Sequence, residues 1–212
     1  MVDSRLATKW LFGTAALAAL SFAAVTSAVL RGKTQRFDQR AKRRVHGARV
    51  DMGHGRALRT AALSTTPLGK WWGYLPASFA TARQLLLRGR GAGAAAVAGT
   101  ALLAALTPPL LKKLLPQRLA PPERDRFSKH SYPSGHALQT SAVAVITSYV
   151  LLREGMAPRW FVAPAGLASL AAGAGRLLLD RHWTSDVIGG YCAGIALGAT
   201  GAGVYELTSV SA

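Results

Sequence analysis

Hydrophobic residues along this chain are gathered in long blocks that short polar and charged stretches separate. A helix needs roughly 20 residues to cross a hydrocarbon core of about 30 Å. Four blocks reach or approach that length without a charge inside them: residues 10–30, 92–111, 137–152 and 187–205. This pattern predicts four membrane-spanning helices.

Two further blocks are less regular, since residues 160–179 include Arg176 and residues 71–87 must accommodate Arg83. Counting both gives about six transmembrane helices. The tryptophans lie at or near the ends of the blocks, where an amphipathic ring favours the lipid headgroup layer: Trp10, Trp71, Trp72, Trp160 and Trp183. We therefore predict an all-α integral membrane bundle, with residues 1–212 forming one domain.

The first block follows Arg5 and Lys9 and resembles a signal peptide with a cleavage site near Ala28. Its apolar run is longer than most signal peptides have. We expect an uncleaved membrane anchor.

The charge of the chain indicates a negatively charged partner, because 26 basic residues against 9 acidic ones give a net charge of +17. Such a balance fits nucleic acid or anionic lipid. Ten of the basic residues lie in residues 31–59, between two predicted spans. We expect residues 31–60 to form one or two interfacial helices on lipid headgroups, although an ordinary basic connector fits equally well. Cys192 is the only cysteine, which excludes an intrachain disulfide.

Prolines predict where the third block ends. Pro108 and Pro109, followed by Pro116, Pro121 and Pro122, should break the helix and give a long irregular loop that reaches Pro133. Loops of this length are usually functional.

In the last block Gly190, Gly194 and Gly198 recur at every fourth residue and form one smooth helix face. Small residues allow helices to approach closely in lipid. We expect this face to pack within the monomer, with a dimer interface as the alternative.

The first run that carries chemistry is Pro133-Ser134-Gly135-His136, directly before an apolar block. Ser134 lies where a helix N-cap belongs, and Gly135 lets a ligand approach the backbone. The start of a helix is a favourable anion site. Taken alone, the run fits a plain capping turn equally well.

The second run joins two blocks, with Arg176 near the end of one and His182 and Asp186 at the start of the next. On a starting helix, a spacing of four lets the Asp186 carboxylate accept a hydrogen bond from one ring nitrogen of His182, leaving the other free to attack. A charge at a membrane helix usually has a partner. The alternative is helix-start stabilisation by Asp186 and a headgroup contact by His182.

With these motifs the chain resembles the type 2 phosphatidic acid phosphatases, relatives of bacterial nonspecific acid phosphatases and vanadium haloperoxidases. The second family motif, Pro-Ser-Gly-His, matches in full. The third motif matches at Arg176, His182 and Asp186, with Gly175 where a serine is usual. The motif region covers about residues 113–190, and the six-span pattern extends the likeness over the chain.

The first family motif, a lysine followed after six residues by Arg-Pro, is incomplete. Lys113 and Pro121 align, but Ala120 occupies the arginine position. We expect Arg118 or Arg124 to replace the missing guanidinium.

The resemblance implies a role for each matching residue. Lys113, Ser134, Gly135 and Arg176 would bind the substrate phosphate together with Arg118. His182 would attack phosphorus and form a phosphohistidine, with Asp186 orienting it. His136 would protonate the departing alcohol and then activate the water that releases phosphate. These roles suit histidine, whose pKa near 6.5 allows either protonation state.

A metal site is the competing interpretation, since His130, His136, His182, Asp180 and Asp186 could bind a divalent ion. The nearby Lys113, Arg176 and Arg181 would repel a cation, so we predict neither a metal nor another cofactor.

The prediction is a metal-independent phosphatase, in the cell membrane, that hydrolyses a phosphomonoester or diphosphate on a lipid, of the polyprenyl diphosphate or phosphatidate type. Two alternatives remain: a lipid phosphotransferase of the same fold and a catalytically weakened lipid-binding homologue. Expected partners are the phosphorylated lipid and membrane lipids, without nucleic acid; the oligomeric state stays open. Counting basic residues places the site in the cytoplasm, whereas the resemblance places it on the extracytoplasmic face, which we predict.

Overall fold

The computed structural model describes residues 3–51, 55–122 and 130–210. Within these residues the chain forms α-helices and two 3₁₀ turns and has no strand, which confirms the all-α prediction. The 3₁₀ turns are η1 (Pro67–Gly69) and η2 (Arg159–Phe161). The α-helices are α1 (Ser4–Leu30), α2 (Gln35–Asp51), α3 (Gly55–Ser64), α4 (Trp71–Leu87), α5 (Gly91–Leu114), α6 (Gly135–Arg153), α7 (Val162–Leu178) and α8 (Thr184–Val210).

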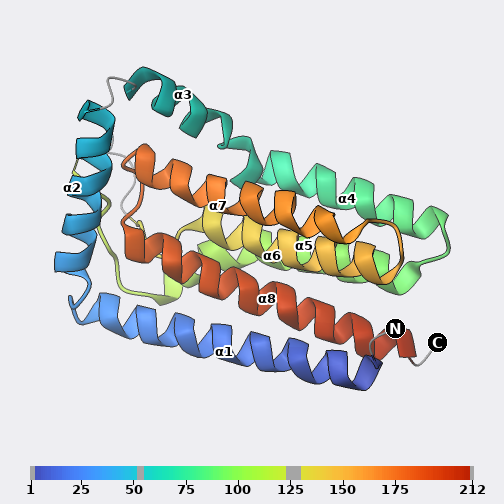
Figure 1. Ribbon diagram of the computed structural model, residues 1–212. Helices are drawn as coiled ribbons and strands as arrows, with labels where there is room; N and C mark the ends of the chain where they lie inside the picture. The colour runs from blue at the N-terminus through green and yellow to red at the C-terminus, as the bar shows by residue number, and fades with distance from the viewer. Residues whose placement is uncertain (1–2, 52–54, 123–129, 211–212) are drawn as a thin grey trace.

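The long helices α1, α4, α5, α6, α7 and α8 lie lengthwise in one bundle, and α2 crosses one end of it (Figure 1). The start of α6 and the start of α8 lie at this same end, which we term the site end. Helix α6 packs against α4, α5, α7 and α8, while α1 lies along α8. The predicted interfacial segment thus forms two helices, α2 and α3, at the site end.

Among the described residues, five helical segments are long and apolar enough to cross a membrane: α1, α5, α6, Arg159–Leu178 and Thr184–Ser209. The predicted sixth, α4, has 17 residues and is therefore about 25 Å long. It lies lengthwise beside α5 in the part of the bundle away from α2 (Figure 1), so the predicted count of about six roughly fits the arrangement.

Small residues bring α6 and α8 close together. A Cβ atom added at Gly190 would lie 2.5 Å from the Ser134 carbonyl oxygen, and one at Gly198 would lie 2.7 Å from that of Ala142. Gly194 contacts the backbone of Leu138 in the same way. The glycine face therefore packs within the monomer, as predicted.

The prediction that Pro108 and Pro109 break the third helix is wrong, because α5 continues through both to Leu114. Each proline removes one backbone donor near the end of the helix, and packing compensates for this loss in membrane helices. Pro108 is buried and lies against Gly135. The irregular segment begins at Leu115 instead.

A buried carboxylate joins three helices at the end opposite the site end. Glu206 of α8 is 1% exposed and accepts hydrogen bonds from Ser4 of α1 and from Tyr149 and Arg153 of α6. The Arg153 Nε to Glu206 Oε1 distance is 2.5 Å. Because a buried charge needs partners, this cluster fixes how α1, α6 and α8 pack.

Candidate active site

Two helix starts and the segment before α6 form the site. The backbone N–H of Ser134 donates to the carbonyl oxygen of Asp186 at 3.0 Å, so the starts of α6 and α8 are joined directly. The Tyr132–Pro133 peptide bond before α6 is cis. The two sequence motifs, about 50 residues apart, therefore meet at one place.

The imidazole of His182 has a defined orientation. Its Nδ1 lies 2.8 Å from the carbonyl oxygen of Ser131 and 3.6 Å from Oδ2 of Asp186. A carbonyl oxygen can only accept a hydrogen bond, so Nδ1 carries the proton in the neutral ring. The lone pair is then on Nε2, which is the arrangement that a nucleophile needs.

Asp186 contacts His182 less directly than predicted. Helix α8 begins at Thr184, so His182 lies before the helix rather than in its first turn. The Asp186 carboxylate accepts the Trp183 backbone N–H at 2.8 Å, as the acidic residue of a capping box does. The nearest partner of the His182 ring is thus Ser131.

Burial lowers the pKa of His182 below its ordinary value of 6.5. The neighbouring Asp186 acts in the opposite direction, while the charge of Lys112 also lowers the pKa. Since burial is the strongest of these effects, His182 is neutral at pH 7 and can attack an electrophile.

The other histidine, His136, lies in the first turn of α6 and contacts the turn before α4. Its ring hydrogen-bonds to the backbone of Thr66, and a side chain at Gly69 would collide with the ring. Arg176 and His182 lie close enough to act on this ring electrostatically. Its Nε2 is buried and has no hydrogen-bond partner among the described residues, as a group that waits for substrate would.

Arg176 is 1% exposed, and one guanidinium nitrogen donates to the Thr66 hydroxyl at 2.6 Å. The preceding Gly175 replaces the usual serine because α3 and α7 are in contact there. A Cβ at Gly175 would collide with the Thr65 hydroxyl and lie 3.2 Å from the Ala62 carbonyl oxygen. The departure from the family motif thus has a packing reason.

Ser134 and Gly135 lie where the sequence predicted them, at the start of α6. Ser134 is the N-cap residue, yet its hydroxyl makes no capping bond and is buried without a partner among the described residues. Gly135 is close to Pro108, with an added Cβ at 3.4 Å. The hydroxyl and the start of the helix are thus available to an anion.

Lys113 is exposed on the last turn of α5. Its neighbour Lys112 is half-buried and acts electrostatically on His182. The structure therefore brings Lys112, which the motif alignment did not select, close to His182.

Arg118, expected to replace the missing phosphate ligand, is bound to carboxylates. Its guanidinium lies 2.5 Å from Asp186 and 2.7 Å from Asp38. Ala120, which occupies the arginine position of the first family motif, is half-buried. Arg124, the other expected replacement, lies outside the described residues.

Sequence reasoning missed Asp38, Thr66 and Ser131, which contact Arg118, Arg176 and His182 respectively. Asp38 is the only acidic residue in the basic stretch 31–50, and that isolation could have identified it. The other two act through backbone atoms or a single hydroxyl and leave no sequence signal.

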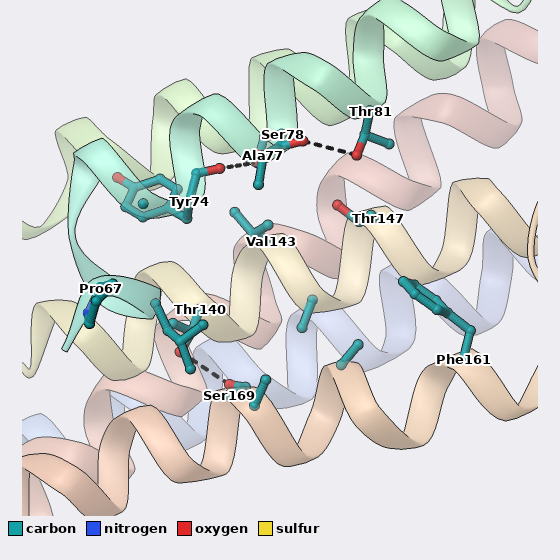
Figure 2. A pocket seen from close by; sticks show the side chains of 15 residues that line it. Pro67, Tyr74, Ala77, Ser78, Thr81, Thr140, Val143, Thr147, Phe161 and Ser169 are labelled. Atoms are coloured by element: carbon teal, nitrogen blue, oxygen red, sulfur yellow. Dashed lines mark hydrogen bonds between the residues drawn. The ribbon is translucent and has the colours of Figure 1, made fainter. Parts of the chain in front are cut away.

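An apolar groove of about 460 Å³ lies between α4, α6 and α7. Figure 2 shows Tyr74 and Ser78 on one wall and Thr140 and Val143 on another, with Ser169 hydrogen-bonded to Thr140. Thr140 lies one turn after His136 and donates to its carbonyl oxygen at 2.7 Å. The groove therefore begins about one turn from His136 and extends along α6.

The potential ligands of the competing metal interpretation do not converge. Within residues 3–51, 55–122 and 130–210, no group of three or more histidine, cysteine, aspartate and glutamate side chains could hold a metal ion. Asp186, for example, is paired with Arg118.

The chain is similar to known proteins in both sequence and fold. The sequence model of the PAP2 superfamily matches residues 89–206. The fold matches the crystal structure of a transmembrane PAP2-type phosphatidylglycerolphosphate phosphatase from Bacillus subtilis, with a TM-score of 0.72 and 20% identity over 89% of this chain and 94% of that one. A lipid A 1-phosphatase of Porphyromonas gingivalis is 37% identical over 83 residues, 39% of this chain. The match spans only 18% of the length of that relative.

Proposed function

The chain belongs to the PAP2 superfamily, and from this premise we propose that it removes phosphate from a membrane lipid through a phosphohistidine at His182. The observation that carries the proposal is the hydrogen bond from His182 Nδ1 to the Ser131 carbonyl oxygen. It leaves Nε2 with the lone pair, directed away from the protein partners of the ring.

In the first step, Nε2 of His182 forms a bond to phosphorus while the bond from phosphorus to the leaving oxygen breaks. Once substrate is bound, the negative charge of its phosphate favours a protonated His136. This His136 gives its Nε2 proton to the leaving oxygen and becomes neutral. The positive charge on the phosphorylated imidazole is balanced by the Asp186 carboxylate, 3.6 Å from Nδ1.

In the second step, the neutral His136 takes a proton from water as its oxygen attacks phosphorus. The bond from nitrogen to phosphorus breaks, inorganic phosphate leaves, and His182 regains its lone pair. One water is consumed, and His136 ends protonated as it began.

Cations and donors stabilise the charge on the phosphoryl oxygens in both steps. Arg176 lies close enough to His136 to act on it electrostatically. Ser134 and Gly135 directly precede His136 at the uncapped start of α6, which adds its dipole. We assign phosphate binding to these three and to Lys113, with Lys112 as an additional cation. Arg118, which the sequence predicted as a phosphate ligand, is instead the counter-ion of Asp186 and Asp38. No step needs a metal, and we propose a metal-independent mechanism.

The groove supports a lipid as the substrate class. Its volume of about 460 Å³ is in the range of ligand sites, and its lining is mostly apolar. A hydrocarbon chain lying between α4, α6 and α7 would place its phosphate beside His136. Phosphatidate-type lipids and polyprenyl diphosphates both meet this requirement.

The test is phosphate release by detergent-purified protein from a panel of phosphatidates, phosphatidylglycerolphosphate, lipid A and polyprenyl diphosphates. We expect release from at least one lipid without an added acceptor alcohol. Release that requires the acceptor would favour the phosphotransferase. Activity that appears only after Ala120→Arg would favour the weakened lipid-binding homologue.

We also propose that the site faces the extracytoplasmic side of the cell membrane, because several of the cations that argue for the cytoplasm have a phosphate-binding role. The exposed Leu119 lies at the site end and the exposed Arg88 at the other end. In a Cys192→Ala background, a membrane-impermeant thiol label should reach Leu119→Cys and spare Arg88→Cys in intact cells. The opposite pattern would place the site in the cytoplasm.

A further inference from the structure

A carboxylate outside the family motifs is built into the site. Asp38 of α2 is 1% exposed. Its Oδ1 accepts the backbone N–H of Ser185 at 2.8 Å, and its Oδ2 accepts the Ser185 hydroxyl at 2.7 Å. Asp38 therefore binds the residue directly before Asp186 at two points.

The same carboxylate shares a guanidinium with Asp186. One terminal nitrogen of Arg118 lies 2.7 Å from Asp38, and the other lies 2.5 Å from Asp186 and 2.8 Å from the Ser185 hydroxyl. One cation thus neutralises two buried carboxylates that come from α2 and α8.

This arrangement controls how much of the Asp186 charge remains for His182. Oδ1 of Asp186 binds Arg118, whereas Oδ2 binds the Trp183 N–H and faces Nδ1 of His182. If Asp38 were neutral, Arg118 would interact with Asp186 alone. The guanidinium charge would then oppose the positive charge that develops on His182.

We infer that Asp38 is a positioning residue, which holds Arg118 and the first turn of α8 so that the Asp186 carboxylate supports His182. This inference rests on the proposed function. It assigns α2, which lies outside the matched residues 89–206, a role in the chemistry.

Asp38→Asn tests the inference, because asparagine is isosteric and can still accept the Ser185 N–H while its charge is lost. We expect kcat to fall roughly 10- to 100-fold, because small displacements of the reacting groups reduce the rate by such factors. KM should stay within about twofold of the wild-type value. Gln39→Ala, an exposed change on the same helix, should leave both constants unchanged.

Two further readouts separate positioning from a merely structural role. The Asp38→Asn/Arg118→Gln double variant should be less impaired than the product of the single effects, since it removes the cation together with its second partner. The pKa of His182, followed by NMR of histidine-labelled protein in detergent, should be lower in Asp38→Asn than in the wild type. This measurement needs no substrate. It therefore tests the role of Asp38 even if none of the lipid substrates named above releases phosphate.

The inference is overturned if Asp38→Asn has wild-type kcat, or if it lowers only the yield of folded protein while the His182 titration and the kcat of the folded fraction stay unchanged. Multiplicative effects in the double variant would also contradict it.

Discussion

The carbonyl oxygen of Ser131 lies 2.8 Å from Nδ1 of His182 and determines which nitrogen of that ring can act as a nucleophile. The contact comes from the segment before α6, whereas His182 precedes α8. The segment before α6 thus sets the tautomer of the histidine that precedes α8.

Replacing the nucleophile should stop the reaction. We expect His182→Ala to lower phosphate release by at least about 1,000-fold, since no other group can form the covalent intermediate. His46→Ala, an exposed change on α2, is the matched control and should retain full activity. A residual rate above one tenth in His182→Ala would rule out the phosphohistidine.

The pH profile should reflect the lowered pKa of His182. Nε2 attacks only when neutral, so the acid limb of kcat/KM that reports His182 should lie below pH 6.5, at the lowered pKa. Asp186 raises this pKa; its removal in Asp186→Asn should move the acid limb to still lower pH and reduce kcat. A limb that moves upward would contradict the assignment.

Vanadate should inhibit phosphate release, because it adopts the five-coordinate geometry of phosphorus in the transition state. Its inhibition should be competitive with substrate. EDTA should leave activity within about twofold in the same assay, since cationic side chains stabilise the phosphate. Strong inhibition by the chelator, reversed by a divalent ion, would show that the mechanism needs a metal.

Restoring the family serine at Gly175 should destabilise the protein, because the added side chain would collide with Thr65. Overpacking of this kind costs about 1–3 kcal/mol, so Gly175→Ser should unfold at a lower temperature. Gly166→Ala on the same helix is the control, with nothing within 4 Å of an added Cβ. A thermal midpoint of Gly175→Ser equal to that of the wild type would contradict the packing explanation.

Filling the groove should affect lipid substrates selectively. Ala144 lines the groove, and Ala144→Trp should raise KM for a long-chain phosphatidate about tenfold or more. Hydrolysis of a short, water-soluble phosphate ester should be unchanged. Leu106→Trp, on an exposed part of α5, is the control. Equal loss for both substrates in Ala144→Trp would mean that the hydrocarbon chain binds elsewhere.

The membrane helices and the two histidine motifs could be predicted from the sequence because they depend on local patterns. Hydropathy over 20 residues identifies a span, and the spacing of His182 and Asp186 is fixed along the chain. The continuation of α5 through Pro108 was not predictable, since packing against Gly135 compensates for the prolines.

The contacts of Arg118 and Arg176 were not predictable for a different reason. Asp38 and Thr66 lie 80 and 110 residues away from the arginines that they bind. Such pairs follow from the docking of α2 and η1 on the bundle, which no local pattern encodes.

The hydrogen bond between Arg176 and Thr66 also reaches outside the segment of residues 89–206 that matches the family. A fragment trimmed to residues 89–206 would retain both imidazoles and most of the bundle core, but it would leave Arg176 without that hydroxyl. The placement of Arg176 therefore depends on residues outside the segment by which the family is recognised, and a fragment limited to residues 89–206 should lose activity.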